Sequence, residues 1–115
     1  MPMTITTKKS FQLSLQDSIS YQDDSIVSKE IFRSATGRIT LFAFAKGQGL
    51  SEHSTPFDAF VQVVDGEAVI TVAGVTSIVK MGEMLYMPAN DTHALKADKQ
   101  FKILLTMIKS DSTPK

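Results

Sequence analysis

Two histidines, His53 and His93, are the residues of this chain best suited to carry chemistry. They are the only histidines in a chain of 115 residues, which contains no cysteine. Imidazole is the commonest metal ligand in proteins, and near neutral pH it also serves as a general acid or base. Each histidine lies beside a turn signal, within EHSTP for the first and PANDTH for the second. The function therefore depends on whether folding brings these two side chains together.

The strands that would position the histidines are predicted from apolar residues that alternate with polar ones. A period of two is typical of strands with one buried face. Strand-like runs cover residues 11–15, 25–33, 37–47, 67–73, 75–81, 84–87, 92–97 and 99–109, with a further strand that ends at Val64. No apolar stripe with the 3.6-residue period of a helix appears. The pattern therefore predicts an all-β fold, either a sandwich or a barrel.

Glycine and proline mark the turns between these strands. Asp65 and Gly66 form a two-residue signal typical of tight hairpins, because glycine accepts the positive φ that such turns require. Gly74 gives a second hairpin signal. Pro88 is expected to end a strand, because proline has no amide hydrogen to donate to a sheet.

Composition restricts the classes of function. Twelve basic and twelve acidic residues give a formal net charge of zero, so no basic field favours binding to nucleic acid. The absence of cysteine excludes disulfides and thiolate chemistry and is compatible with a reducing cytosol. The N-terminal sequence MPMTITTKKS lacks the apolar run of a signal peptide, and no stretch reaches the roughly twenty apolar residues of a membrane span. We expect a cytoplasmic protein with no nucleic-acid or membrane partner.

The length fits one domain with one core. We expect residues 11–109 to form this domain, residues 1–10 to be a loose tail or an edge strand, and residues 110–115 to be a disordered tail. Several strands are apolar on both faces although a barrel needs only one apolar face, which predicts a homodimer. The residues expected to face the second subunit are drawn from Phe42, Phe44, Phe60, Leu104 and Ile108.

The segment around His53 resembles the first motif of the cupin family of small β-barrels. That motif is written G-x5-H-x-H-x3-4-E-x6-G, and Gly47, His53 and Gly66 occupy its first glycine, first histidine and last glycine. Thr55 stands in place of the second histidine, and Ala59 stands in place of the glutamate.

The segment around His93 is similar to the second cupin motif, G-x5-P-x-G-x2-H-x3-N. Gly82, Pro88 and His93 match it, whereas Asn90 replaces a glycine and Ala97 replaces the final asparagine. Asparagine tolerates positive φ better than other residues with side chains, so we expect Asn90 to keep the turn. The resemblance implies a cupin-type jelly-roll barrel, also described as a double-stranded β-helix.

In the cupin family the motif histidines and glutamate point into the barrel and hold one divalent metal ion. The resemblance thus implies that His53 and His93 are metal ligands for manganese, iron, nickel, copper or zinc. Strand alternation places four pocket-lining residues on the same face as His53, namely Thr55, Ala59, Val61 and Val63. Because catalytic metal sites usually have three protein ligands, two imidazoles form an incomplete and weak site, so the presence of a metal stays open.

A third ligand would have to come from another donor near the histidines. The donors are Glu52, Asp58, Gln62, Met84, Tyr86 and Met87. Strand alternation directs the first three away from the pocket, and the last three could reach in from a neighbouring strand. Methionine would suit cuprous copper, although core packing is the favoured explanation for six methionines.

Three functions are compatible with these residues. The first is a small cupin that binds a small molecule in its barrel and has a degenerate metal site. The second is a metal-dependent cupin enzyme, of the dioxygenase or isomerase type, that uses both histidines and a nonstandard third ligand. The third is a metal-free enzyme with a histidine as acid or base, for which Asp58 or Asp91 would have to orient the imidazole.

Overall fold

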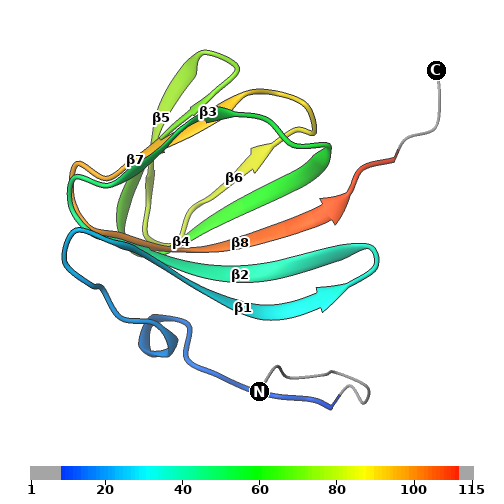
Figure 1. Cartoon of the computed structure of the whole chain (residues 1–115), viewed down its shortest axis with the longest axis horizontal. Coiled ribbons are helices and arrows are strands. Elements are labelled where there is room, and N and C mark those ends of the chain that lie inside the picture. The colour runs from blue at the N-terminus through cyan, green and yellow to red at the C-terminus, as the bar shows by residue number, and fades with distance from the viewer. Residues whose placement is uncertain (1–8, 112–115) are drawn as a thin grey trace.

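The computed structural model describes residues 9–111, and within this range nearly all regular structure is β-strand (Figure 1). One short 3-10 helix, η1 (Gln16–Ser18), precedes the strands. The strands are β1 (Ile26–Ser34), β2 (Gly37–Phe44), β3 (Gly49–His53), β4 (Phe57–Val72), β5 (Val75–Lys80), β6 (Met84–Met87), β7 (His93–Lys96) and β8 (Phe101–Lys109). The all-β fold class predicted from the sequence is confirmed.

The strands form one antiparallel sheet that curls into a barrel. Its order is β1-β2-β8-β4-β7-β3, and β5 and β6 also pair with β4. In Figure 1 the curl brings β3 and β7 over β8 and β2. The long strand β4 belongs to both halves, because its first half pairs with β8 and β6 and its second half with β5 and β7. The sheet therefore places the two motif segments on facing strands.

The predicted hairpin at Asp65 and Gly66 is wrong. β4 runs through both residues, and its register with β8 shifts between Val63 and Asp65. Gly66 has a φ of 73°, and a Cβ at this position would overlap the carbonyl oxygen of Gln100. Glycine is thus required here for two reasons. The bulge has a positive φ, as a hairpin turn does, and the close approach to β8 leaves no room for a Cβ.

The second predicted hairpin is confirmed. Val72 pairs with Val75, and the two residues between them, Ala73 and Gly74, have φ values of 48° and 82°. Two consecutive positive φ angles are the signature of the tight turn that matches the twist of antiparallel strands. The strand end at Pro88 is confirmed as well, because β6 ends at Met87.

The strand predicted for residues 11–15 does not form. Phe11 is 60% exposed, and the segment leads into η1 without pairing to any strand within residues 9–111. Its apolar side chains serve instead to cover the outer face of the sheet, where Leu15 and Ile19 pack in a cluster with Leu41 and Ala43. Figure 1 shows this segment, in blue, beside β1. The alternation thus reflects side-chain burial without the backbone pairing of a strand.

The remaining sequence expectations concern the surface and the chain ends. Phe42 and Phe44 belong to the barrel interior, and Leu104 is covered by the N-terminal cluster, so these three do not lie on a free outer face. The tails expected at 1–10 and 110–115 lie mostly outside the described range, and residues 9, 10, 110 and 111 are not in strands. Within residues 9–111, the structure contains no helix with the length and apolar character needed to cross a membrane.

Candidate functional site

The structure brings His53 and His93 together. The end of β3 pairs with the start of β7, so that the two residues are direct cross-strand partners. Their ring centroids are 4.3 Å apart, and the rings meet edge to face at 69°. The spacing of the two motifs therefore produces a histidine pair at one end of the barrel.

The loop before His93 depends on Asn90. This residue has a φ of 71°, the left-handed conformation expected for the residue that replaces the motif glycine. Its amide donates a 2.7 Å hydrogen bond to the carbonyl of Thr55. Loop 88–92 is thus held to the chain just after His53, which fixes both histidine segments together.

The two imidazoles have different environments. His53 is exposed, and its Nδ1 donates a hydrogen bond of 2.7 Å to the carbonyl oxygen of Ser51. His93 is only 6% exposed, and its Nδ1 is buried without a hydrogen-bond partner among residues 9–111. Buried polar atoms are nearly always hydrogen-bonded in native proteins, so this nitrogen requires an explanation.

Burial also changes the protonation of His93. Removal of the ring from water lowers the pKa of His93 and the nearby His53 lowers it further, whereas the backbone of Asp91 acts in the opposite direction, although its geometry falls short of a hydrogen bond to Nδ1. A lowered pKa favours the neutral ring near pH 7, with one nitrogen as donor and the other as acceptor. His93 can therefore form hydrogen bonds to a neutral group.

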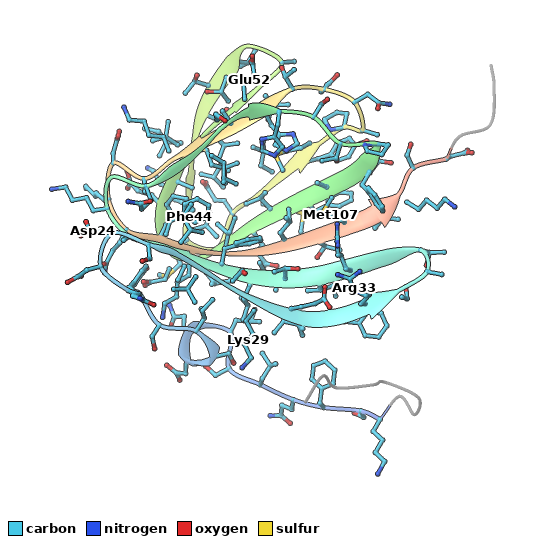
Figure 2. All side chains as sticks on the ribbon, viewed as in Figure 1. Asp24, Lys29, Arg33, Phe44, Glu52 and Met107 are labelled. Atoms are coloured by element: carbon cyan, nitrogen blue, oxygen red, sulfur yellow. The ribbon has the colours of Figure 1, made fainter. Side chains whose placement is uncertain are left out.

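His93 lies in the wall of a small interior cavity with a volume of about 50 Å³. The lining residues are Phe42, Phe44, Leu50, Thr55, Ala59, Val61, Met87, His93, Leu95, Ile103, Leu105 and Met107. His93 and Thr55 are the only polar residues in this lining. Figure 2 labels Phe44 and Met107 on the inner side of the curled sheet.

The residues predicted from strand alternation are placed as follows. Thr55, Ala59 and Val61 line the cavity, and His53 does not. Val63 is buried, with 1% exposure, but it does not line the cavity. It lies in the core cluster that contains the rings of Phe44 and Phe101, stacked at 4.5 Å, which fill this part of the interior.

Sequence reasoning missed the lining contributed by β2, β7 and β8. Phe42 was expected at a subunit interface, yet it faces the cavity together with Leu95 and Met107. The signal was present in the alternation of residues 37–47, which puts Phe42 and Phe44 on one face. Alternation does not state which face is the inner one, because both faces of this strand are apolar.

Three of the donors considered as a third metal ligand lie away from the histidine pair. Asp58 accepts hydrogen bonds from the hydroxyl of Tyr86 at 2.7 Å and from the amide of Ala89 at 3.0 Å, on the outer face of the sheet. Glu52 is exposed, and Figure 2 labels it at the upper surface of the molecule. Met84 is 61% exposed.

The residues in the described range therefore do not fit the metal centre implied by the motifs. No group of three or more His, Cys, Asp or Glu side chains within residues 9–111 is arranged to hold a metal ion. Thr55 and Ala59, which occupy two of the four ligand positions, supply a hydroxyl and a methyl group. Met87 lines the cavity, but one thioether and two imidazoles form a poor donor set for hard divalent ions.

Comparison with known families and structures gives a consistent identification. The family model described as "Cupin domain" matches residues 40–108. A conserved protein of unknown function from Streptococcus pyogenes is 32% identical, with a TM-score of 0.83, over 92% of this chain and 93% of its own. A cupin superfamily protein from Desulfitobacterium hafniense is 27% identical, with a TM-score of 0.82, over 90% of this chain and 94% of its own.

A cupin 2 conserved barrel domain protein from Leptotrichia buccalis is 39% identical, with a TM-score of 0.82. The match covers 84% of this chain but 47% of that protein, so this chain corresponds to about half of it. No curated protein matches the sequence.

Proposed function

Since the chain belongs to the cupin domain family, we propose that it is a cupin that binds a small, mainly apolar molecule in its barrel and has lost the family's metal centre. One observation carries this proposal. His93 lines a cavity whose other side chains are almost entirely apolar, and its Nδ1 is buried and has no hydrogen-bond partner in the described part of the chain.

An unpaired buried nitrogen is a source of binding energy. Leaving such a group without a hydrogen bond costs about 1–3 kcal/mol, and a ligand that supplies the missing partner recovers this energy. Since His93 is favoured in its neutral form, a hydroxyl or carbonyl group of the ligand is a suitable partner. The ligand thus combines an apolar body with at least one hydrogen-bonding group.

The size of the cavity restricts the ligand. Its volume of about 50 Å³ corresponds to about four water positions, at roughly 10–15 Å³ for each water. About four non-hydrogen atoms of a ligand fit inside, and a ring such as that of cyclohexanol must extend past the rim. Leu50, which is 37% exposed and also lines the cavity, lies at this rim.

Binding is better supported than catalysis by these residues. A general acid or base needs an orienting partner, and Asp58 is occupied on the opposite face by Tyr86 and Ala89. His53 uses its Nδ1 on a backbone carbonyl and is exposed to solvent. A metal-dependent mechanism therefore lacks a third ligand among residues 9–111, and Asp58 is not placed to orient a histidine for acid–base catalysis.

Titration of ¹⁵N-labelled protein with 1-butanol, cyclohexanol and 4-hydroxybenzyl alcohol tests the proposal. We expect amide shifts concentrated at the cavity-lining residues of β2, β4, β7 and β8. The substitution His93→Leu keeps an apolar side chain of similar size but removes the hydrogen bond, so affinity should fall roughly tenfold.

The matched control is His53→Leu, which removes the exposed histidine outside the cavity lining and should leave affinity unchanged. The proposal is wrong if none of the three alcohols shifts the lining residues. It is also wrong if His53→Leu weakens binding as much as His93→Leu does.

A further inference from the structure

A second hollow, of about 220 Å³, lies at the hairpin between β1 and β2. Its lining residues are Arg33, Ser34, Ala35, Gly37, Arg38 and Phe57. In contrast to the apolar cavity, it presents two guanidinium groups. Figure 2 labels Arg33 at this hairpin, on the same side of the molecule as Met107.

The register of the sheet places this hollow next to the apolar cavity. Arg38 on β2 is the cross-strand partner of Met107 on β8, and Met107 is in turn the partner of Ala59 on β4. Paired residues in an antiparallel sheet direct their side chains to the same face. Because Met107 and Ala59 line the apolar cavity, Arg38 lies on the cavity side of the sheet.

Arg33 and Phe57 belong to the same face. Arg33 is the cross-strand partner of Arg38, and Phe57 precedes Ala59 by two residues on β4. A separation of two residues in a strand keeps the face unchanged. The two hollows are therefore neighbours on the inner side of one sheet.

The charges in the second hollow leave one guanidinium available. Glu30 accepts hydrogen bonds from Nε and Nη2 of Arg33 at 2.8 to 3.0 Å, which pairs this arginine. Arg38 is half-buried, and no carboxylate in residues 9–111 forms an ion pair with it. The group formed by Glu30, Arg33 and Arg38 thus has a net charge of plus one.

We propose that this hollow binds the carboxylate of the same ligand whose apolar body occupies the cavity, so that the ligand is a small organic monocarboxylate. The planar fork of a guanidinium matches the two oxygens of a carboxylate, and one unpaired arginine balances one negative charge. Met107 and Ala59, which line the cavity, lie in register with Arg38 on adjacent strands. This inference depends on the proposed binding function and adds the chemical class of the ligand.

A pair of matched probes tests the carboxylate assignment separately from the proposed binding function. The alcohol 4-hydroxybenzyl alcohol and the acid 4-hydroxybenzoate share the ring and the phenol, and they differ in the group that would reach Arg38. Isothermal titration calorimetry at low salt should show roughly tenfold tighter binding of the acid. This preference should decrease at high salt because the new contact is between charges.

Substitutions locate the preference. Arg38→Gln should abolish it and leave the affinity for the alcohol unchanged, and Arg38→Lys should retain part of it. The control Lys80→Gln removes the same charge from β5, on a residue that lines neither hollow, and should change nothing. Glu30→Gln frees Arg33, so it should tighten binding of the acid several-fold without an effect on the alcohol.

The outcomes of this experiment are distinct. Equal binding of acid and alcohol, with no effect of Arg38→Gln and Glu30→Gln, overturns the carboxylate assignment and leaves the proposed binding function intact. Absence of binding by either probe, together with failure of the smaller alcohols, overturns both. If Lys80→Gln weakens binding of the acid as much as Arg38→Gln does, the assignment to this hollow is overturned.

Discussion

At the scale of single residues, the site is defined by what surrounds His93. Its partner ring, His53, contributes an edge-to-face contact at 4.3 Å but keeps its own Nδ1 on a backbone carbonyl. The positions where the family motif has its other ligands hold Thr55 and Ala59, both in the cavity wall. Substitutions at these two positions would thus add metal-binding donors to a wall in which His93 and Thr55 are the polar residues.

We predict that the double variant Thr55→His, Ala59→Glu binds zinc or manganese at least about a hundredfold more tightly than the unmodified chain. The expectation follows because three or more protein donors around one point define most stable metal sites. Elemental analysis of protein purified without a polyhistidine tag, followed by calorimetry with each metal, measures the effect. The control carries Thr55→His, Ala59→Glu and also His93→Leu, and it should lose the gained affinity. A near-stoichiometric metal in the unmodified chain would contradict the prediction.

The residues of the site could be predicted from sequence only in part. Motif spacing led to the histidine pair and to the role of Asn90, because both depend on order along the chain. Motif spacing does not show how deep in the barrel a residue lies. Val63 was therefore expected to line the pocket, although stacked rings fill the interior there. Arg38 was missed altogether, because a charged residue in a strand pattern looks like a solvent-exposed position until the register places it beside Met107.

At the scale of elements, the loop between β6 and β7 determines how the two motif segments meet. Asn90 in its left-handed conformation donates to Thr55, and the amide of Ala73 donates a 2.8 Å hydrogen bond to the carbonyl of Thr92. The loop is thus tied to the segment after β3 and to the end of β4.

We predict that Asn90→Ala destabilises the protein by about 1–2 kcal/mol, because alanine pays this amount in the left-handed region, which the short polar side chain of asparagine tolerates. Asn90→Gly should be close to neutral, since glycine adopts this conformation without steric cost. Urea denaturation followed by circular dichroism measures both. Equal stability of the alanine and glycine variants would show that the conformation of this residue does not limit the loop.

Strand patterns predicted most elements because each sheet face has a consistent environment. They did not predict the continuation of β4 through Asp65 and Gly66, because a bulge and a hairpin turn use the same residue types. They also could not separate residues 11–15 from a strand. A segment that lies on a sheet and a strand that belongs to one can bury the same alternate side chains.

At the scale of the whole molecule, the outer face of the sheet retains an apolar area. Phe60 and Tyr86 stack there with ring centroids 5.0 Å apart, and Ile108 is 48% exposed. Asp58, on the same face, is already hydrogen-bonded by Tyr86 and Ala89. An apolar face whose carboxylate is hydrogen-bonded is suited to pack against an identical face of a second copy, since the carboxylate keeps its polar partners when water is excluded.

The homodimer expected from the sequence is therefore predicted to form through Phe60, Tyr86 and Ile108. Light scattering coupled to size-exclusion chromatography should give twice the chain mass at micromolar concentration. Ile108→Glu should shift the protein to a monomer because it places a second carboxylate beside that of Asp58, its cross-strand partner, in the interface. The matched control is Ile78→Glu on β5, where Ile78 is 56% exposed, and it should remain dimeric. A monomeric unmodified chain would refute the prediction.

The sixteen-residue strand β4 pairs with β5, β6, β7 and β8, and this shared pairing determines how the molecule unfolds. Neither half of the barrel has an independent set of hydrogen bonds, so separate unfolding of one half would expose a strand that the other half needs. The chain should thus behave as one cooperative unit, with its slowest amide exchange in β4. Pairing of β8 with both β2 and β4 also joins distant parts of the chain, which favours folding over milliseconds to seconds.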